Sequence, residues 1–138
     1  MSTRWTLGLP LLVTLFVALG AVGPAAAGHA WSTPVLTIDP DSLRQLTRQG
    51  RAVLAIDVRP RELYEAGRLP GARSIPLTAL TARQRELPAD GLVVLYGADS
   101  VDEAAAAFRY LRSAGRTNVF VLEGGYAAWR ASGYGIEY

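Results

Sequence analysis

The sequence predicts a single α/β domain, with an open parallel five-stranded sheet and helices on both faces. Three observations indicate this fold. Short apolar segments rich in β-branched residues alternate along the chain with segments of helical periodicity. The segment Leu92–Tyr96 is apolar on both faces, which is typical of strands that crossover helices cover on both sides. A chain of 138 residues is also about the length of one domain.

The first half of the domain supplies two pairs of a strand and a helix. Val35–Ile38 is a short β-rich run, and the helical pattern of Asp41–Arg48 follows it. Ala52–Asp57 is the next apolar run, and Arg61–Ala66 follows with helical spacing. Because a helix separates the two strands, we expect them to lie parallel.

The second half continues this alternation. Its strands are predicted over 74–75, 92–96 and 119–122. Its helices are predicted over 78–85, 101–114 and 126–131, and the second of these is the longest helix of the chain. Ligands of parallel sheets bind at the carboxyl ends of the strands, so the loops after Asp57, Tyr96 and Leu122 are the candidate sites.

Residues 1–27 have the composition of a secretory signal peptide. Arg4 gives a positive start, Leu7–Val22 is an uncharged apolar stretch, and the small residues that follow fit cleavage after Ala27. The alternative is an uncleaved anchor formed by residues 5–22, because the apolar stretch approaches the roughly 20 residues that span a bilayer. Both alternatives predict export, to the periplasm, to the medium or on a membrane anchor.

Residues 28–34 are predicted to form a short tether, and residues 35–138 the folded domain. The only histidine of the chain, His29, lies in the tether. Because the chain offers it no second histidine and no cysteine as a partner, we do not expect it to hold a metal. We expect no cofactor either.

The charges of the chain are nearly balanced. All 14 basic residues are arginines and 12 residues are acidic; removing residues 1–27 takes away only Arg4, which leaves 13 basic residues and a net charge of +1. No run of five like charges occurs, so no nucleic-acid partner is predicted. The chain contains no cysteine, and it can therefore form neither a disulfide nor a thiolate.

Two motifs resemble the signature of the rhodanese-like superfamily. Residues 56–76 contain Asp-Val-Arg, a tyrosine and Gly-Arg-Leu-Pro-Gly-Ala, where the family pattern ends in Gly-His-Ile-Pro-Gly-Ala. Residues 118–125 contain Leu-Glu-Gly-Gly, and Trp129 follows, as in the C-terminal segment of the family. The resemblance covers nearly all of residues 35–138 and implies the family's fold. One departure is Arg68, where the family usually has a histidine that mainly closes a turn.

Most of these motif residues are predicted to have structural roles. Asp57 ends a buried strand, and we expect it to order the next loop by accepting hydrogen bonds from the backbone or from Arg59. The Pro-Gly pair is typical of a turn, the Gly-Gly pair permits backbone angles closed to other residues, and the tryptophan is expected in the core. The residues with predicted structural roles are Asp57, Arg59, Pro70, Gly71, Gly124, Gly125 and Trp129.

The resemblance also identifies a missing residue. In active relatives the strand equivalent to Leu92–Tyr96 leads into a cysteine and a loop whose backbone amides face a bound anion. Counting back from the Leu-Glu-Gly-Gly motif places the cysteine position at Ala98, whereas counting forward from the strand places it at Gly97, and both alternatives stay open. The degenerate loop, which is a possible ligand-binding site, consists of Gly97, Ala98, Asp99, Ser100, Val101, Asp102 and Glu103.

Loop 97–103 is not expected to be catalytic. It carries three carboxylates and no basic residue, so like charges would oppose thiosulfate or phosphate. Ser100 and Glu103 have the spacing of a capping box at the start of the next helix. Ser100 would also need an adjacent base to act as a nucleophile, and the chain has no histidine besides His29.

The sequence therefore predicts an exported, non-catalytic rhodanese-like module that binds an unknown protein partner or a small anion. A second hypothesis is an accessory protein of sulfur metabolism that binds sulfur oxyanions for a catalytic companion. A third is an assembly role, in which Arg68 and Arg73 and the acidic loop form complementary surfaces. A membrane is a predicted partner only if the N-terminal segment is not cleaved.

Overall fold

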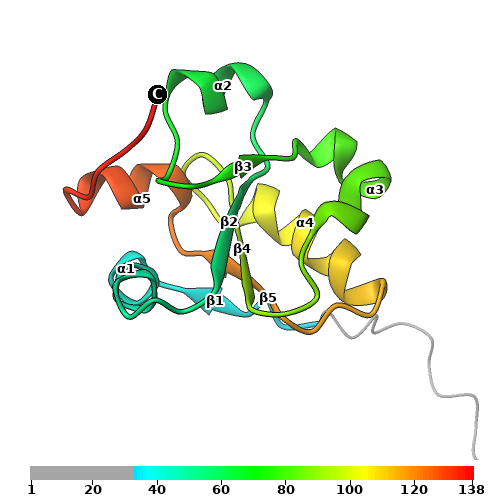
Figure 1. Cartoon of the computed structure of the whole chain (residues 1–138). Coiled ribbons are helices and arrows are strands. Elements are labelled where there is room, and N and C mark those ends of the chain that lie inside the picture. Colours follow the sequence, from blue (N-terminus) through cyan, green and yellow to red (C-terminus); the bar gives the residue numbers. More distant parts are fainter. Residues whose placement is uncertain (1–32) are drawn as a thin grey trace, which may run out of the picture. The chain divides into compact units, whose positions relative to one another are not determined.

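The computed structural model describes residues 33–138 (Figure 1). The predictions for residues 1–27 and for most of the tether lie outside these residues and stay predictions. The described residues form a five-stranded parallel sheet with the strand order β1-β5-β4-β2-β3. The predicted α/β fold with an open parallel five-stranded sheet is thus confirmed.

The elements follow the predicted alternation. The strands are β1 (Thr37–Ile38), β2 (Val53–Asp57), β3 (Arg73–Ser74), β4 (Leu92–Tyr96) and β5 (Val119–Leu122). The α-helices are α1 (Pro40–Arg48), α2 (Arg61–Ala66), α3 (Leu80–Arg83), α4 (Asp102–Ser113) and α5 (Gly125–Ala131). Two short 3-10 helices, η1 (Leu77–Ala79) and η2 (Gln84–Glu86), flank α3.

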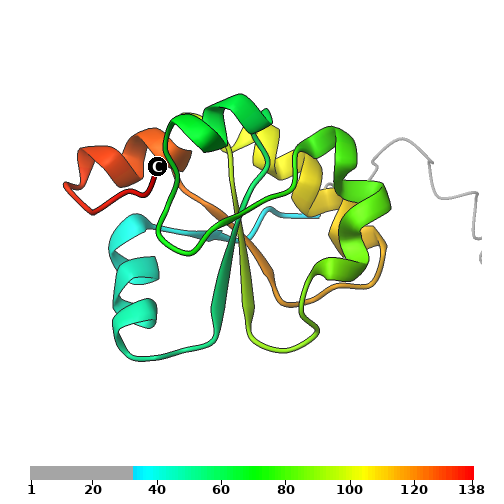
Figure 2. The ribbon, with the colours of Figure 1, turned by 45° about the horizontal axis from the view of Figure 1, so that its top comes forward.

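Helices cover both faces of the sheet. In Figures 1 and 2, α1 and α5 lie on one side of the strands, and α3 and α4 lie on the other. Phe108 of α4 is fully buried in the cluster on its side of the sheet. Leu43 of α1 and Trp129 of α5 belong to the cluster on the opposite side. The sheet is therefore the middle of three layers, as expected for parallel strands joined by helices.

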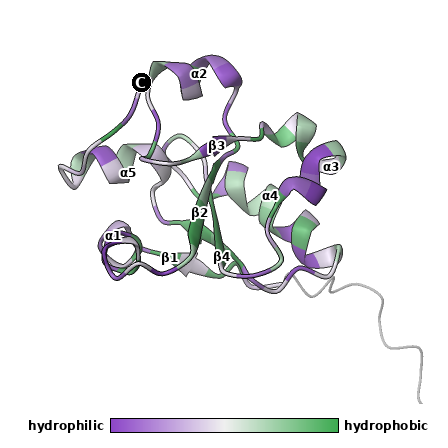
Figure 3. Cartoon of the chain, viewed as in Figure 1, coloured by the Kyte–Doolittle hydropathy of each residue, from purple (hydrophilic) through white to green (hydrophobic). Residues whose placement is uncertain are grey.

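The central strand β4 contributes to both cores. Val93 and Leu95 pack with α4, whereas Val94 and Tyr96 pack with α1 and α5. Successive side chains of a strand point to opposite faces, so a strand that is covered on both sides must be apolar at every position. The hydropathy colouring of Figure 3 shows this concentration of apolar residues on β2 and β4.

Several element boundaries differ from the predictions for physical reasons. The segment 78–85, predicted as one helix, consists of η1, α3 and η2 in succession. Helix α1 begins at Pro40, one residue before the predicted start, because the Asp39 carboxylate accepts a hydrogen bond from the Ser42 N–H at 2.9 Å and caps the helix. Proline suits this first helical position because it has no N–H to satisfy.

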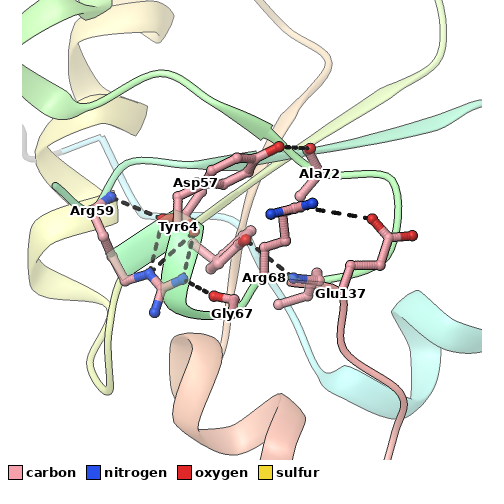
Figure 4. Close-up of polar contacts among 9 residues, drawn as sticks. Asp57, Arg59, Tyr64, Gly67, Arg68, Ala72 and Glu137 are labelled. Atoms are coloured by element: carbon pink, nitrogen blue, oxygen red, sulfur yellow. Dashed lines mark hydrogen bonds and ion pairs between the residues drawn. The ribbon is translucent and has the colours of Figure 1, made fainter. Parts of the chain in front are cut away.

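A buried ion pair joins the end of β2 to the loop that follows α2 (Figure 4). Asp57 has no exposed surface and Arg59 is 3% exposed. The Asp57 carboxylate accepts hydrogen bonds from the Arg59 N–H at 3.0 Å, from Nε at 2.9 Å and from Nη2 at 2.6 Å. Nη2 also donates to the Gly67 carbonyl at 2.7 Å. These bonds connect Asp57 to the loop that follows β2 and, through Arg59, to Gly67.

Aromatic rings enclose the Arg59 guanidinium. Its central carbon lies 4.1 Å from the centre of the Tyr126 ring and 5.6 Å from that of Tyr96. Burial by itself lowers the pKa of Arg59, but the hydrogen bonds and the negative charge of Asp57 outweigh it and raise this pKa above its ordinary value. The Arg59 guanidinium therefore stays charged, and its contacts connect β2, β4 and α5.

The start of α5 is fixed against the end of β4. The N–H groups of Tyr126 and Ala127 donate to the carbonyl oxygens of Gly97 and Ala98 at 2.9 and 2.8 Å. Gly125 has a φ of +56°, and a Cβ at this position would lie 2.6 Å from the Gly97 oxygen. At position 125 only glycine satisfies both the backbone angle and the close approach.

We expect Asp57→Asn to reduce the free energy of unfolding by about 3–5 kcal/mol, because the substitution leaves the buried Arg59 charge without its counter-charge. Urea denaturation measures this change. A matched control is Glu65→Gln, which removes the exposed Arg61–Glu65 ion pair and should have a much smaller effect. Equal effects of the two substitutions would contradict a special role for the buried pair.

We expect Gly125→Ala to be more destabilising than Gly71→Ala by about 1–3 kcal/mol, because only the former forces a methyl group into a packed carbonyl. Gly71 has a φ of +70° with no atom within 4 Å of an added Cβ, so it controls for backbone strain alone. Thermal and urea unfolding of both variants measure the difference. Indistinguishable stabilities would show that the contact between Gly125 and Gly97 does not constrain the fold.

Candidate functional site

The three loops that the sequence singled out lie at one edge of the sheet. Strand β2 pairs in parallel with β4, and β4 pairs with β5, so their carboxyl ends point the same way. The Val58 N–H donates to the Tyr96 carbonyl at 3.1 Å, which brings together the loops after β2 and β4. The bonds from Tyr126 and Ala127 bring the loop after β5 to the same place. This edge is the candidate site.

Loop 97–103 occupies the centre of this edge. Gly97 follows directly on β4 and is buried, whereas Ala98 and Ser100 are exposed. An added Cβ at Gly97 would lie 3.0 Å from Oε2 of Glu103, so the Glu103 side chain covers this position. Of the two positions proposed for the missing cysteine, only Ala98 presents its side chain to solvent.

The predicted capping box is wrong. Helix α4 begins at Asp102, and its N-cap is Val101, which makes no side-chain capping bond. Ser100 lies one residue before the N-cap, so its hydroxyl cannot reach the amides that a capping serine satisfies. The carboxylates of Asp102 and Glu103 still suit the first turn, because negative charge there interacts favourably with the helix dipole.

The backbone carbonyl groups and N–H groups of loop 97–103 differ in their hydrogen bonding. The carbonyl oxygens of Gly97 and Ala98 are bound by α5. The N–H groups of residues 98–101, in contrast, donate no hydrogen bond to any residue within 33–138. Amides of this kind can bind an anion, but Asp99, Asp102 and Glu103 place three carboxylates beside them, and within residues 33–138 none of these forms an ion pair.

Side chains near the loop supply no nucleophile. The Tyr96 hydroxyl lies in the interior and accepts a hydrogen bond from the Leu69 N–H at 3.3 Å. Burial, followed by the charge of Asp57, raises the pKa of Tyr96 far above its ordinary value, so the phenol stays protonated. Ser100 has no histidine beside it to act as a general base, because the only histidine of the chain is His29. Residues 33–138 also contain no group of three acidic or histidine side chains placed to hold a metal.

Two further motif residues, Gly71 and Trp129, lie in a turn and in the core. Gly71 adopts a positive φ of 70° in the turn that Pro70 begins. Trp129 is 5% exposed, and its indole N–H donates to the Gly135 carbonyl at 2.9 Å. These contacts position the segment after α5.

Arg68, which stands where the family usually has histidine, fastens the C-terminal segment. Its N–H donates to the Glu137 carbonyl at 2.9 Å, and its Nη2 donates to the Tyr138 carbonyl at 2.7 Å. Its guanidinium also lies 4.7 Å from the centre of the Tyr64 ring. Arg73, which the assembly hypothesis paired with Arg68, is exposed on β3.

The sequence did not indicate that Tyr126 and Tyr96 are the rings around Arg59. It also did not indicate that Arg59 donates a hydrogen bond to the Gly67 carbonyl. The sequence feature that indicated a partner for Asp57 was the position of Arg59, two residues after the end of β2. The identity of the surrounding rings depends on how β4 and α5 pack, which no spacing in the sequence reveals.

Comparisons with known proteins place this geometry in a family. The chain is 41% identical over 92 residues to the HTH-type transcriptional regulator Rv0324 of Mycobacterium tuberculosis, covering 65% of this chain and 40% of the regulator. It is 34% identical over 97 residues to the thiosulfate sulfurtransferase GlpE of Pseudomonas putida, covering 69% of this chain and 84% of that enzyme. The chain spans only part of three curated relatives, 40%, 62% and 54% of their lengths.

A solved structure and a family model agree with these relatives. The crystal structure of the Alr3790 protein from Anabaena superposes with a TM-score of 0.67 and 34% sequence identity, covering 72% of this chain and 81% of that one. The model of the rhodanese-like domain matches residues 39–132, which include every element from α1 to α5. The chain therefore belongs to the rhodanese-like domain family.

Proposed function

We propose that the chain is a non-catalytic rhodanese-like module that binds a protein partner or a small ligand. The observation that carries this proposal is the absence of cysteine from all 138 residues. Sulfur transfer by a protein persulfide requires a thiolate to attack the sulfur donor and to carry the sulfur. Gly97 and Ala98, the two candidates for the position of the family's cysteine, have no reactive side chain.

The surroundings of loop 97–103 support the same proposal. Carboxylates replace the basic residue common in active loops, so the electrostatic potential at this edge opposes sulfur oxyanions and phosphate. Five surface cavities of about 290 to 570 Å³ within residues 33–138 are all lined by residues outside this loop. The proposal therefore assigns binding to another part of the surface.

An accessory role in sulfur metabolism is the second candidate. The unbonded N–H groups of residues 98–101 favour it, because they are the groups that would bind a sulfur oxyanion. The similarity to GlpE, which carries the name of a thiosulfate sulfurtransferase, is compatible with such a role. In this case the module would deliver the anion to a catalytic companion and would not itself react.

Calorimetric titration with thiosulfate, sulfite and phosphate separates the two candidates. For the favoured proposal we expect no saturable heat, because three carboxylates repel these anions. The variant Asp99→Asn/Asp102→Asn is the matched control, since it removes two exposed charges and retains the backbone amides. Saturable binding of thiosulfate to the wild-type protein that becomes tighter in this variant would place the anion at the loop, contradict the favoured proposal and support the accessory role.

We further propose that the module is exported. Residues 1–27 supply the positive start, the apolar stretch and the small residues of a signal peptide. Within residues 33–138, no helix is both long enough and apolar enough to cross a membrane.

We expect the mature protein to begin at Gly28 and to be released from the membrane fraction, because Ala27 gives signal peptidase the small residue that it requires before the cut. Mass spectrometry of fractionated cells measures this. Ala27→Phe should abolish processing, whereas Ala26→Phe, one residue further from the cut, should leave it intact. A full-length wild-type protein retained in the membrane would show that the segment is an anchor.

A further inference from the structure

A pocket beside α1 is a second place where the structure could bind a ligand. Its volume is about 310 Å³, within the lower range of small-molecule sites. It lies over β2, between α1 and the turn at 70–71. Its apolar wall consists of Leu43, Val53, Ala55, Leu69 and Trp129. We call it the α1 pocket.

The apolar wall is formed by residues that the fold already holds in place. Leu43, Leu69 and Trp129 are 3%, 2% and 5% exposed. The only polar atom of the Trp129 side chain donates to the Gly135 carbonyl, so the indole presents carbon to the pocket. An occupant would therefore meet a rigid apolar surface, which favours binding because little side-chain freedom is lost.

The charged side chains that line the α1 pocket are both cationic. Arg44 and Arg48 lie one turn apart on α1 and both line the pocket, and no acidic side chain does. Within residues 33–138, neither of them forms an ion pair. Like charges at this spacing are mildly unfavourable in a helix, and a bound anion would relieve their repulsion.

Asp41 is an acidic residue of the same helix, but within residues 33–138 it forms no ion pair with either arginine. Asp41 lines a neighbouring cavity together with Arg44 and Arg48, but it accepts the hydroxyl hydrogen bond of Tyr134. The Arg44 guanidinium lies 4.4 Å from the centre of the Tyr134 ring. This stacking restrains Arg44 while leaving its N–H groups without an acceptor within residues 33–138.

We propose that the α1 pocket binds a small organic anion that has an apolar body and one carboxylate. The apolar body packs against the wall over β2, and the carboxylate accepts charge-assisted hydrogen bonds from Arg44 and Arg48. The pocket is lined by none of the residues of loop 97–103. The inference therefore goes beyond the function proposed for the module, and it stands whether or not the loop binds oxyanions.

Octanoate is the probe that tests this proposal, because it joins an apolar chain to a single carboxylate. Calorimetry on the purified protein should show saturable binding of one octanoate. Octyltrimethylammonium, which has the same chain with the opposite charge, should not bind. Octanol should bind about tenfold more weakly than octanoate, since it loses the charge-assisted hydrogen bonds.

Variants of α1 locate the site. Arg44→Gln/Arg48→Gln should weaken octanoate binding about tenfold or more. The control is Arg51→Gln, because Arg51 does not line the pocket, and this substitution should change octanoate binding by less than about twofold. Thr47→Phe keeps both guanidiniums and fills the pocket from an exposed helical position, so it should abolish binding. Circular dichroism confirms that each variant is folded.

Three results would overturn the proposal. The first is no binding of octanoate to the folded wild-type protein. The second is equal binding of octanoate, octanol and octyltrimethylammonium, which would show that the charge of the ligand is not recognised. The third is unchanged binding in the folded Thr47→Phe variant, which would place octanoate elsewhere on the protein.

Discussion

The buried charge of Asp57 is the constraint on which the candidate site depends. A carboxylate at the covered end of a strand requires hydrogen-bond donors and a counter-charge, and Arg59 supplies both. To do so, Arg59 must also lie in the interior, where the Gly67 carbonyl and the Tyr126 ring complete its surroundings. A buried pair of this kind adds little net stability compared with apolar residues, but losing one partner is strongly unfavourable, so the pair mainly specifies a single arrangement.

This arrangement determines what loop 97–103 can do. Tyr126, which packs on Arg59, also lies in the first turn of α5, and its N–H donates to the Gly97 carbonyl. The backbone after β4 is therefore tied to α5 through its carbonyl groups, at the place where active relatives have the nucleophile. The amides that remain share loop 97–103 with three carboxylates. The rhodanese-like fold is thus combined with a loop that has no cysteine, and the cationic α1 pocket is a separate place where we propose that this chain binds an anion.

Much of this structure follows from the sequence. Strands β4 and β5 were predicted at their observed bounds, because a strand covered on both faces must be a continuous apolar run and few other segments qualify. The hydrogen bonds between Asp57 and Arg59 could be expected, because they join residues two apart. The capping box failed because the spacing of Ser100 and Glu103 does not determine at which residue a helix begins. The α1 pocket was not foreseen, since its walls come from distant segments that only the packing brings together.

We propose that this domain has the fold of the rhodanese-like family without its sulfur-transfer activity. A cyanide-coupled assay with thiosulfate as the sulfur donor tests it most directly, with GlpE of Pseudomonas putida as the positive control. The account predicts that the purified protein forms thiocyanate no faster than a heat-denatured sample does. Thiocyanate formation that increases with the concentration of folded protein, and that is lost on denaturation, would contradict it.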